Sequence, residues 1–112
     1  MISKYKRILI LAPHTDDGEF GCGGSIARFV REGLEIHYAA FSLAEESVPN
    51  GLPKDILHTE LINATGVLGI PRSNLHIYKY PVRKLSYYRQ DILENLVAIN
   101  RELNPDLVFT PS

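Results

Sequence analysis

The sequence predicts an α/β fold in which an open parallel sheet carries helices on both faces. Strand-like and helix-like segments alternate strictly along the chain, which is the order that builds parallel sheets. The first strand-like segment, Arg7-Ile8-Leu9-Ile10-Leu11-Ala12, is a continuous apolar run, typical of a strand that is covered on both faces. Each link between strands is long enough for a right-handed crossover.

The elements are expected in the following order. After the strand at 7–12, a helix at 25–32 places Ile26, Phe29 and Val30 on one face and stops at Gly33. A second strand at 35–42 leads into a polar loop at 43–52. Pro53 suits the first position of the second helix, which Gly69 ends. A third strand at 75–78, a helix at 89–103 and a fourth strand at 107–110 follow. This alternation favours an order that puts the first strand in the interior, with its carboxyl end beside that of the fourth.

Length and composition limit the classes of protein to which this sequence can belong. At 112 residues, with 45% hydrophobic and 22% charged residues, the chain suits one soluble globular domain. The formal net charge of −1, with both signs interleaved, argues against nucleic acid or a membrane surface as a partner. The single cysteine, Cys22, excludes a disulfide framework, and the start of the chain is unlike a secretory signal. We therefore expect a cytoplasmic protein.

The most informative segment is Ala12-Pro13-His14-Thr15-Asp16-Asp17-Gly18-Glu19, which directly follows the first strand. Zinc binds neutral imidazole nitrogen and carboxylate oxygen, and a catalytic zinc site uses three protein ligands plus water. His14 and Asp17, three residues apart in a turn, can reach one ion. Asp16 lies between them and is free to take a proton from the metal-bound water. The same residues are also common in plain turns, so the spacing alone leaves a structural role open.

A family resemblance favours the metal site. Pro13-His14-Thr15-Asp16-Asp17, followed by Gly21-Cys22-Gly23-Gly24-Ser25-Ile26-Ala27, resembles the opening of the PIG-L/LmbE-like N-deacetylase family. The likeness extends along the chain to Asn104-Pro105-Asp106-Leu107-Val108-Phe109-Thr110-Pro111, although only the first block is specific. It implies a Rossmann-like fold and zinc-dependent hydrolysis of an N-acyl amide, with N-acetyl expected, on an amino sugar or sugar conjugate. By position, it makes His14 and Asp17 metal ligands and Asp16 the general base.

The sequence departs from the family pattern in two places. Thr15 replaces the usual proline, and Gly18 stands where the family has a glutamate, with Glu19 one step later. The family also takes its third ligand from a histidine in a stretch after the fourth strand, beyond Ser112. Residues 1–112 thus resemble the N-terminal part of a single deacetylase domain. We expect this chain alone to have little or no deacetylase activity.

Two other functions stay open at this point. Gly21, Gly23 and Gly24 invite a nucleotide-binding Rossmann module, although their spacing is G-x-G-G rather than G-x-G-x-x-G. A non-catalytic fragment that associates with itself as a homo-oligomer is the other alternative.

Several side chains outside the motif also attract attention. His37, His58 and His76 are candidates for the missing ligand, but lone histidines are more often structural or exposed. Tyrosines that either stack on a sugar or cover a sheet edge are Tyr78, Tyr80, Tyr87 and Tyr88.

Overall fold

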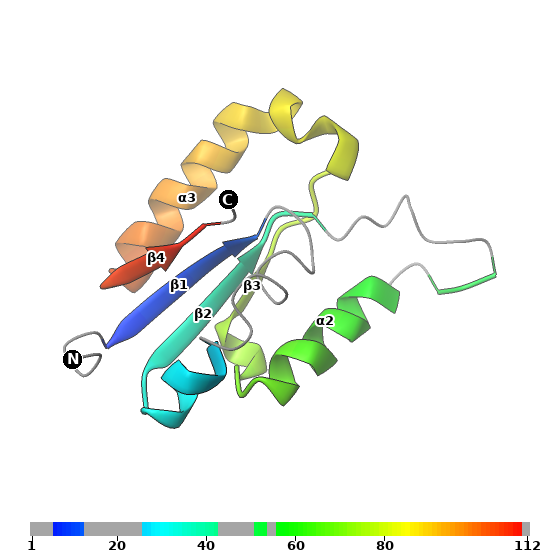
Figure 1. Cartoon of the computed structure of the whole chain (residues 1–112). Coiled ribbons are helices and arrows are strands. Elements are labelled where there is room, and N and C mark those ends of the chain that lie inside the picture. Colours follow the sequence, from blue (N-terminus) through cyan, green and yellow to red (C-terminus); the bar gives the residue numbers. More distant parts are fainter. Residues whose placement is uncertain (1–5, 13–25, 43–50, 54–55, 111–112) are drawn as a thin grey trace.

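Four strands form one parallel sheet with β1 in its interior. The computed structural model describes residues 6–12, 26–42, 51–53 and 56–110. The strands β1 (Arg7–Ala12), β2 (Glu35–Ala40), β3 (Leu75–Ile77) and β4 (Leu107–Phe109) lie in the order β3-β2-β1-β4, and every neighbouring pair is parallel (Figure 1). The predicted α/β class and the predicted interior place of the first strand are both confirmed, and the architecture is a Rossmann-like open sheet.

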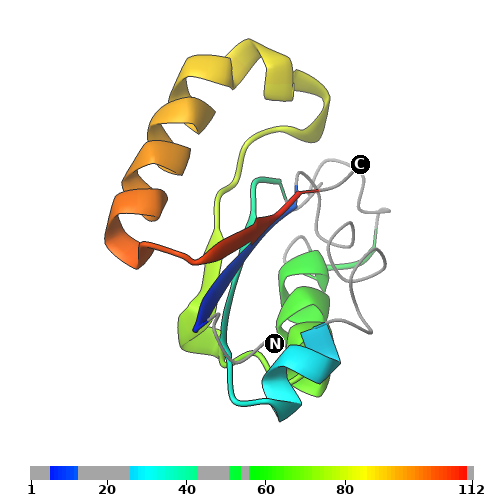
Figure 2. The same ribbon diagram turned by 60° about the vertical axis from the view of Figure 1, so that its left-hand side comes forward.

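Both faces of the sheet are covered by helices. On one face, Ile8, Ile10 and Ala12 pack with β2 residues against the helical residues 26–31 and α2 (Ile56–Val67). On the other face, Leu9 packs against Ile99 and Leu103 of α3 (Arg89–Leu103). Figure 2 shows α3 on one side of the sheet and the other two helical segments on the opposite side. The alternation of β1 side chains between two cores explains why its sequence is apolar without interruption.

Two glycines end helices with the same hydrogen-bond pattern. Gly33, at φ +82°, donates its N–H to Val30 O, and Leu34 donates to Phe29 O. Gly69, at φ +93°, repeats the arrangement, donating to Gly66 O while Ile70 donates to Thr65 O. This is the Schellman motif, in which a residue in the left-handed region satisfies the last helical carbonyls.

The sequence-based boundaries differ from the structure mainly near short 3-10 turns. The turns η3 (Arg72–Asn74) and η4 (Val82–Tyr88) each follow a proline, and neither was predicted. Pairing with β2 continues past β3, because Tyr78 N–H donates to Ala40 O at 2.8 Å and Tyr80 N–H donates to Phe41 O at 3.0 Å. The third strand-like stretch therefore extends further than the regular strand does.

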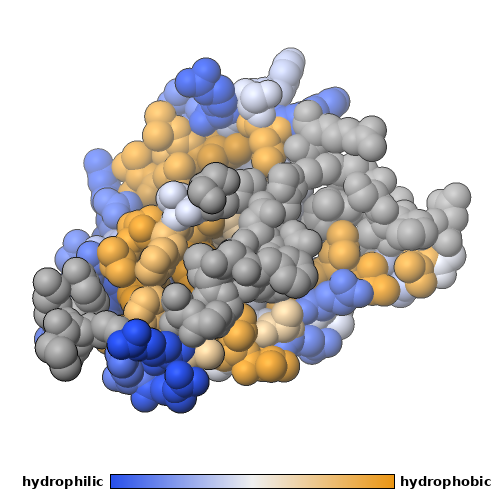
Figure 3. Space-filling model, in the orientation of Figure 1, coloured by the Kyte–Doolittle hydropathy of each residue, from blue (hydrophilic) through white to orange (hydrophobic). Residues whose placement is uncertain are grey.

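Hydrophobic residues gather over α3 and along β4 on the face shown in Figure 3. Leu93 and Val97 on α3 and Val108 on β4 are each about half exposed. Among the described strands, β4 pairs only with β1 and leaves its other edge open. Apolar edge strands favour association with other chains, so self-association stays an expectation. None of the helices in the described parts of the chain is long and apolar enough to cross a membrane.

Alanine in place of Gly69 should destabilise the fold more than alanine in place of Gly33. Both positions have positive φ, which costs about 1–2 kcal/mol for a residue with a Cβ. At position 69 the new Cβ would also lie 2.7 Å from Val30 Cγ1, whereas nothing lies within 4 Å at position 33. We expect Gly69→Ala to lower the free energy of unfolding by about 2–4 kcal/mol in a urea titration, since overpacking adds to the backbone cost. Equal losses for the two variants would contradict the close approach of Val30.

Candidate functional site

The carboxyl ends of β1 and β4 lie side by side, where the strand order reverses. The chain passes from β1 to β2 and β3 in one direction and then returns by α3 to β4 on the other side of β1. In open α/β sheets, ligands bind outside the carboxyl ends of the strands at such a topological switch point. The segment with the predicted site residues begins immediately after Ala12, the last residue of β1. His14, Asp16 and Asp17 themselves lie outside the described residues, as do Gly18, Glu19 and the glycine cluster at 21–24.

Backbone hydrogen bonds and stacking hold this edge in place. Ala12 is fully buried, and its carbonyl oxygen accepts a hydrogen bond from Phe41 N–H at 3.0 Å. The Phe41 ring stacks on Tyr78 with ring centroids 5.0 Å apart. The starting point of the motif segment is therefore fixed by the pairing of β1 with the end of β2.

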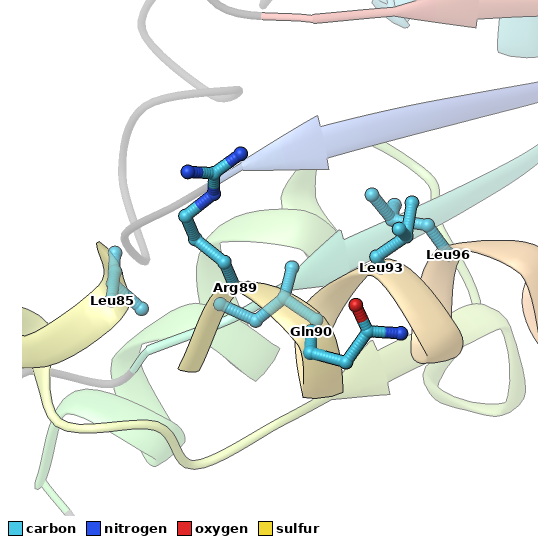
Figure 4. Close-up of a pocket in the computed structure, with 6 residues that line it drawn as sticks. Leu85, Arg89, Gln90, Leu93 and Leu96 are labelled. Carbon is cyan, nitrogen blue, oxygen red and sulfur yellow. The ribbon is translucent and has the colours of Figure 1, made fainter. Parts of the chain in front are cut away.

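A cavity of about 280 Å³ lies beside this edge, between the sheet and the first half of α3. We call it the carboxyl-edge cavity, and it is lined by Leu11, Ala12, Phe41, Leu85, Ile92, Leu96 and Thr110. A second hollow of about 480 Å³ shares Leu85, Ile92 and Leu96 with it and adds Arg89, Gln90 and Leu93 (Figure 4). Sequence reasoning missed this hollowed region, because aliphatic residues that line a cavity look the same in sequence as residues that fill a core.

Most of the tyrosines considered as sugar platforms have packing roles. Tyr78 is stacked in the core below α3, and Tyr80 donates its hydroxyl to Asn95 Oδ1 at 2.5 Å. Burial raises the pKa of both phenols, followed by the negative charge of Glu102 for Tyr78 and of Asp91 for Tyr80. Tyr88 packs against Tyr80, whereas Tyr87 is 83% exposed and remains available as a stacking surface.

The histidines considered as ligands lie away from the carboxyl edge or form other contacts. His37 is buried and pairs in register with Leu9, in the middle of β1. Its Nδ1 lies 2.9 Å from His76 Nε2, and its Nε2 lies 2.5 Å from Glu35 Oε2. His58 lies on α2. Within the described residues, no three metal-binding side chains form a group that could hold an ion, so these histidines do not supply a complete site.

The histidine pair belongs to a series of polar side-chain contacts that crosses the sheet from β3 to β1. Glu35 Oε2 also lies 2.7 Å from Arg7 Nε, and Arg7 Nη1 donates to the carbonyl oxygen of Leu103 at the end of α3. The hydrogen bond from His37, with help from Arg7, lowers the pKa of Glu35 despite some desolvation. Burial, followed by the neighbouring His37, lowers the pKa of His76. These contacts join β1, β2, β3 and α3, which is a structural role.

Comparisons with known proteins agree with the sequence motif. The family whose sequence pattern matches residues 9–112 is PIG-L, described as GlcNAc-PI de-N-acetylase. The Bacillus anthracis protein named "Probable N-acetyl-alpha-D-glucosaminyl L-malate deacetylase 2" is 27% identical over 114 residues, covering 94% of this chain and 50% of that protein. This chain thus spans about half the length of the curated relative that it matches.

Two solved structures show the same fold. N,N'-diacetylchitobiose deacetylase from Pyrococcus horikoshii superposes with a TM-score of 0.87 at 26% identity, over 98% of this chain and 42% of that chain. The 4-carboxy-2-hydroxymuconate hydratase GalB from Pseudomonas putida KT2440 superposes with a TM-score of 0.74 at 22% identity, over 92% of this chain and 45% of its own. At 22% identity, the likeness to GalB concerns the fold alone.

Acid should destabilise the folded chain through His76, and His76→Gln should reduce this effect. Because the folded-state pKa of His76 lies below its ordinary value of about 6.5, the unfolded chain takes up the proton first as the pH falls. The stability that neutral His76 contributes is complete above its ordinary pKa and is lost as the pH falls toward its folded-state pKa. Glutamine does not titrate but can still donate to His37 Nδ1. Urea titrations at about pH 7.5 and about pH 5.5 should show a smaller loss for the variant. An unchanged loss would assign the acid sensitivity to groups other than His76.

Proposed function

Because the chain belongs to the PIG-L family, described as GlcNAc-PI de-N-acetylase, we propose that it carries the metal-binding loop of a zinc-dependent deacetylase. The proposed substrate is an N-acetylated amino sugar or sugar conjugate. One observation carries the proposal: the segment His14-Thr15-Asp16-Asp17 directly follows β1, the interior strand at the switch point of the sheet.

The chemistry of the motif's side chains suits zinc. An imidazole and a carboxylate, from His14 and Asp17, are the nitrogen and oxygen ligands that zinc takes in catalytic sites. A bound zinc polarises a carbonyl and makes water more acidic. A third protein ligand is needed to hold the ion, and the proposal takes it from polypeptide that follows β4 in a longer product of the gene.

Asp16 is the proposed general base of the hydrolysis. Its carboxylate accepts a proton from the attacking water, whose oxygen forms a bond to the amide carbonyl carbon. The C–N bond then breaks, and the nitrogen leaves as an amine after receiving a proton from an acid. The products are a carboxylic acid, acetate in the proposed case, and the free amino sugar. Asp16 lies between the two proposed ligands in sequence, so one short turn would supply both binding and proton transfer.

The named relatives support deacetylation more than other reactions on this fold. The Bacillus anthracis and Pyrococcus horikoshii proteins are both named as deacetylases of N-acetylated amino sugars. The hydratase shows that the fold alone does not fix the reaction. Equilibrium dialysis against zinc and against a dinucleotide would separate the deacetylase from the nucleotide-binding alternative, since each predicts retention of a different ligand.

Replacing Asp16 by asparagine should lower turnover strongly while leaving zinc binding intact. The amide keeps the shape of the carboxylate but accepts no proton, and loss of a general base typically costs about 10²- to 10⁴-fold in rate. The measurements are hydrolysis of an N-acetylglucosamine conjugate by the extended gene product and its zinc content. Asp91→Asn makes the same chemical change on the exposed side of α3 and serves as the control. Full activity of Asp16→Asn would remove Asp16 from the mechanism.

Residues 1–112 alone should bind zinc weakly and turn over little or no substrate. Only His14 and Asp17 are available as proposed ligands, and two ligands leave a catalytic zinc site incomplete. The test compares this chain with the extended product under added zinc, using the same N-acetylglucosamine conjugate. Comparable turnover by both proteins would show that the ligand assignment is wrong.

A further inference from the structure

His37 and His76 bring two imidazole nitrogens face to face on the side of the sheet that α3 covers. His76 pairs in register with Ala39, and His37 lies two residues earlier on β2, so both side chains project from the same face. His37 Nδ1 lies 2.9 Å from His76 Nε2. Two imidazole nitrogens bound to one ion at about 2.0–2.1 Å lie about 2.8–3.4 Å apart for bond angles between about 90° and 110°. The pair therefore has the spacing of two ligands of one metal ion.

A carboxylate determines which nitrogen of His37 is free. Glu35 Oε2 accepts a hydrogen bond from His37 Nε2–H at 2.5 Å, and Arg7 Nε lies 2.7 Å from the same oxygen. The hydrogen bond from His37 lowers the pKa of Glu35, so the carboxyl is ionised at neutral pH. The proton of His37 is therefore held on Nε2, and the lone pair of Nδ1 faces His76. Histidines that bind metals almost always donate their other N–H to a carboxylate, a carbonyl or water, and His37 has this arrangement.

His76 supplies the second nitrogen. Burial, followed by the neighbouring His37, lowers the pKa of His76, so its ring is neutral at pH 7, which is the form that binds metals. A neutral imidazole carries its proton on either nitrogen. With the proton on Nε2, His76 donates to His37 Nδ1. With the proton on its own Nδ1, both facing nitrogens present lone pairs, so a bound ion would take the place of one shared proton without a change in net protonation.

The pair can be reached from solvent and lies among charges that favour a cation. His76 is partly exposed on β3, which is an edge strand of the sheet (Figure 1). Two carboxylates and one guanidinium act on the pair, from Glu35, Glu102 and Arg7. Within the described residues no third metal-binding side chain joins the pair, so solvent oxygen completes the coordination of a bound ion.

We propose that His37 and His76 bind a divalent transition-metal ion that joins the edge strand β3 to β2. Imidazole nitrogen suits zinc, copper and nickel, whereas magnesium and calcium take oxygen ligands. His37 pairs in register with Leu9, three residues before Ala12 at the end of β1, so the pair lies about 10 Å along the sheet from the start of the motif segment. The site is separate from the proposed catalytic loop and does not rest on the proposed function.

Calorimetric titration with Ni²⁺ tests the site without relying on catalysis. The starting protein has no affinity tag and carries His14→Ala and Asp17→Asn, which removes the proposed loop ligands. We expect one Ni²⁺ per chain at about pH 7.5. His76→Gln can still donate to His37 Nδ1 but should weaken binding by at least about tenfold, since loss of an outer-shell partner alone costs about 10- to 100-fold. His58→Gln removes a histidine on α2 and is the control. Equal affinities of the two variants overturn the proposal.

A second pair of variants tests the orientation of His37 by Glu35. Glu35→Gln no longer fixes the proton on Nε2, because an amide can donate as well as accept, and binding should weaken by about 10- to 100-fold. Glu32→Gln makes the same change at an exposed glutamate near Arg28 and is the control. Because an ion that binds only the folded chain stabilises it, Ni²⁺ should raise the unfolding temperature of the control and not that of His76→Gln. An equal rise in both would contradict the site.

Nitrogen-15 spectra of the unsubstituted chain identify the ligands even if a variant does not fold. On addition of Zn²⁺, the resonances of His37 Nδ1 and His76 Nε2 should shift together, whereas those of His58 should stay. Shifts confined to His14 would place the ion in the loop alone and overturn the second site. Failure of the Asp16 test with intact binding at the histidine pair would reject the proposed reaction instead, so the two failures are distinguishable.

Discussion

Burial of β1 on both faces and both edges is the constraint on which the other features depend. Its apolar side chains enter two separate cores, and its backbone pairs with β2 on one side and β4 on the other. Buried peptide groups must be hydrogen-bonded, because an unpaired group costs about 1–3 kcal/mol. The register of β1 is thus fixed on both faces and both edges, and the segment after Ala12 starts from a defined point.

The two ends of the sheet differ in how they contact α3. At the amino end, Asp106 accepts hydrogen bonds from the N–H groups of Lys6 and Arg7, which lowers the pKa of its carboxyl, and Arg7 also bonds to the last turn of α3. Ile99 and Leu103 in that half of α3 are buried. At the carboxyl end, Ile92 and Leu96 border a cavity instead. Helix α3 is therefore packed against the sheet in its carboxyl half and borders a cavity in its amino half.

Local sequence was sufficient for the fold but not for the site. Gly33 and Gly69 end their helices as predicted, because their positive φ angles are local requirements. The contact between His37 and His76 joins residues 39 positions apart and follows from the register of β2 with β3, which no local pattern encodes. The cavity depends on how far α3 stands from the sheet, and the stripe of Ile92 and Leu96 predicts only that this face is apolar. The motif at His14, Asp16 and Asp17 was identified by its family resemblance, and its geometry remains a prediction.

The proposed reacting groups and the cavity belong to different parts of the chain. In the proposed site, the reacting groups belong to one turn after β1, whereas most of the cavity wall belongs to η4 and α3. Substitutions on α3 can change the volume beside the reaction without moving the strand that carries the motif, because β1 is fixed by its own pairing. The similar sheets of a deacetylase and a hydratase show that the sheet alone does not fix the reaction.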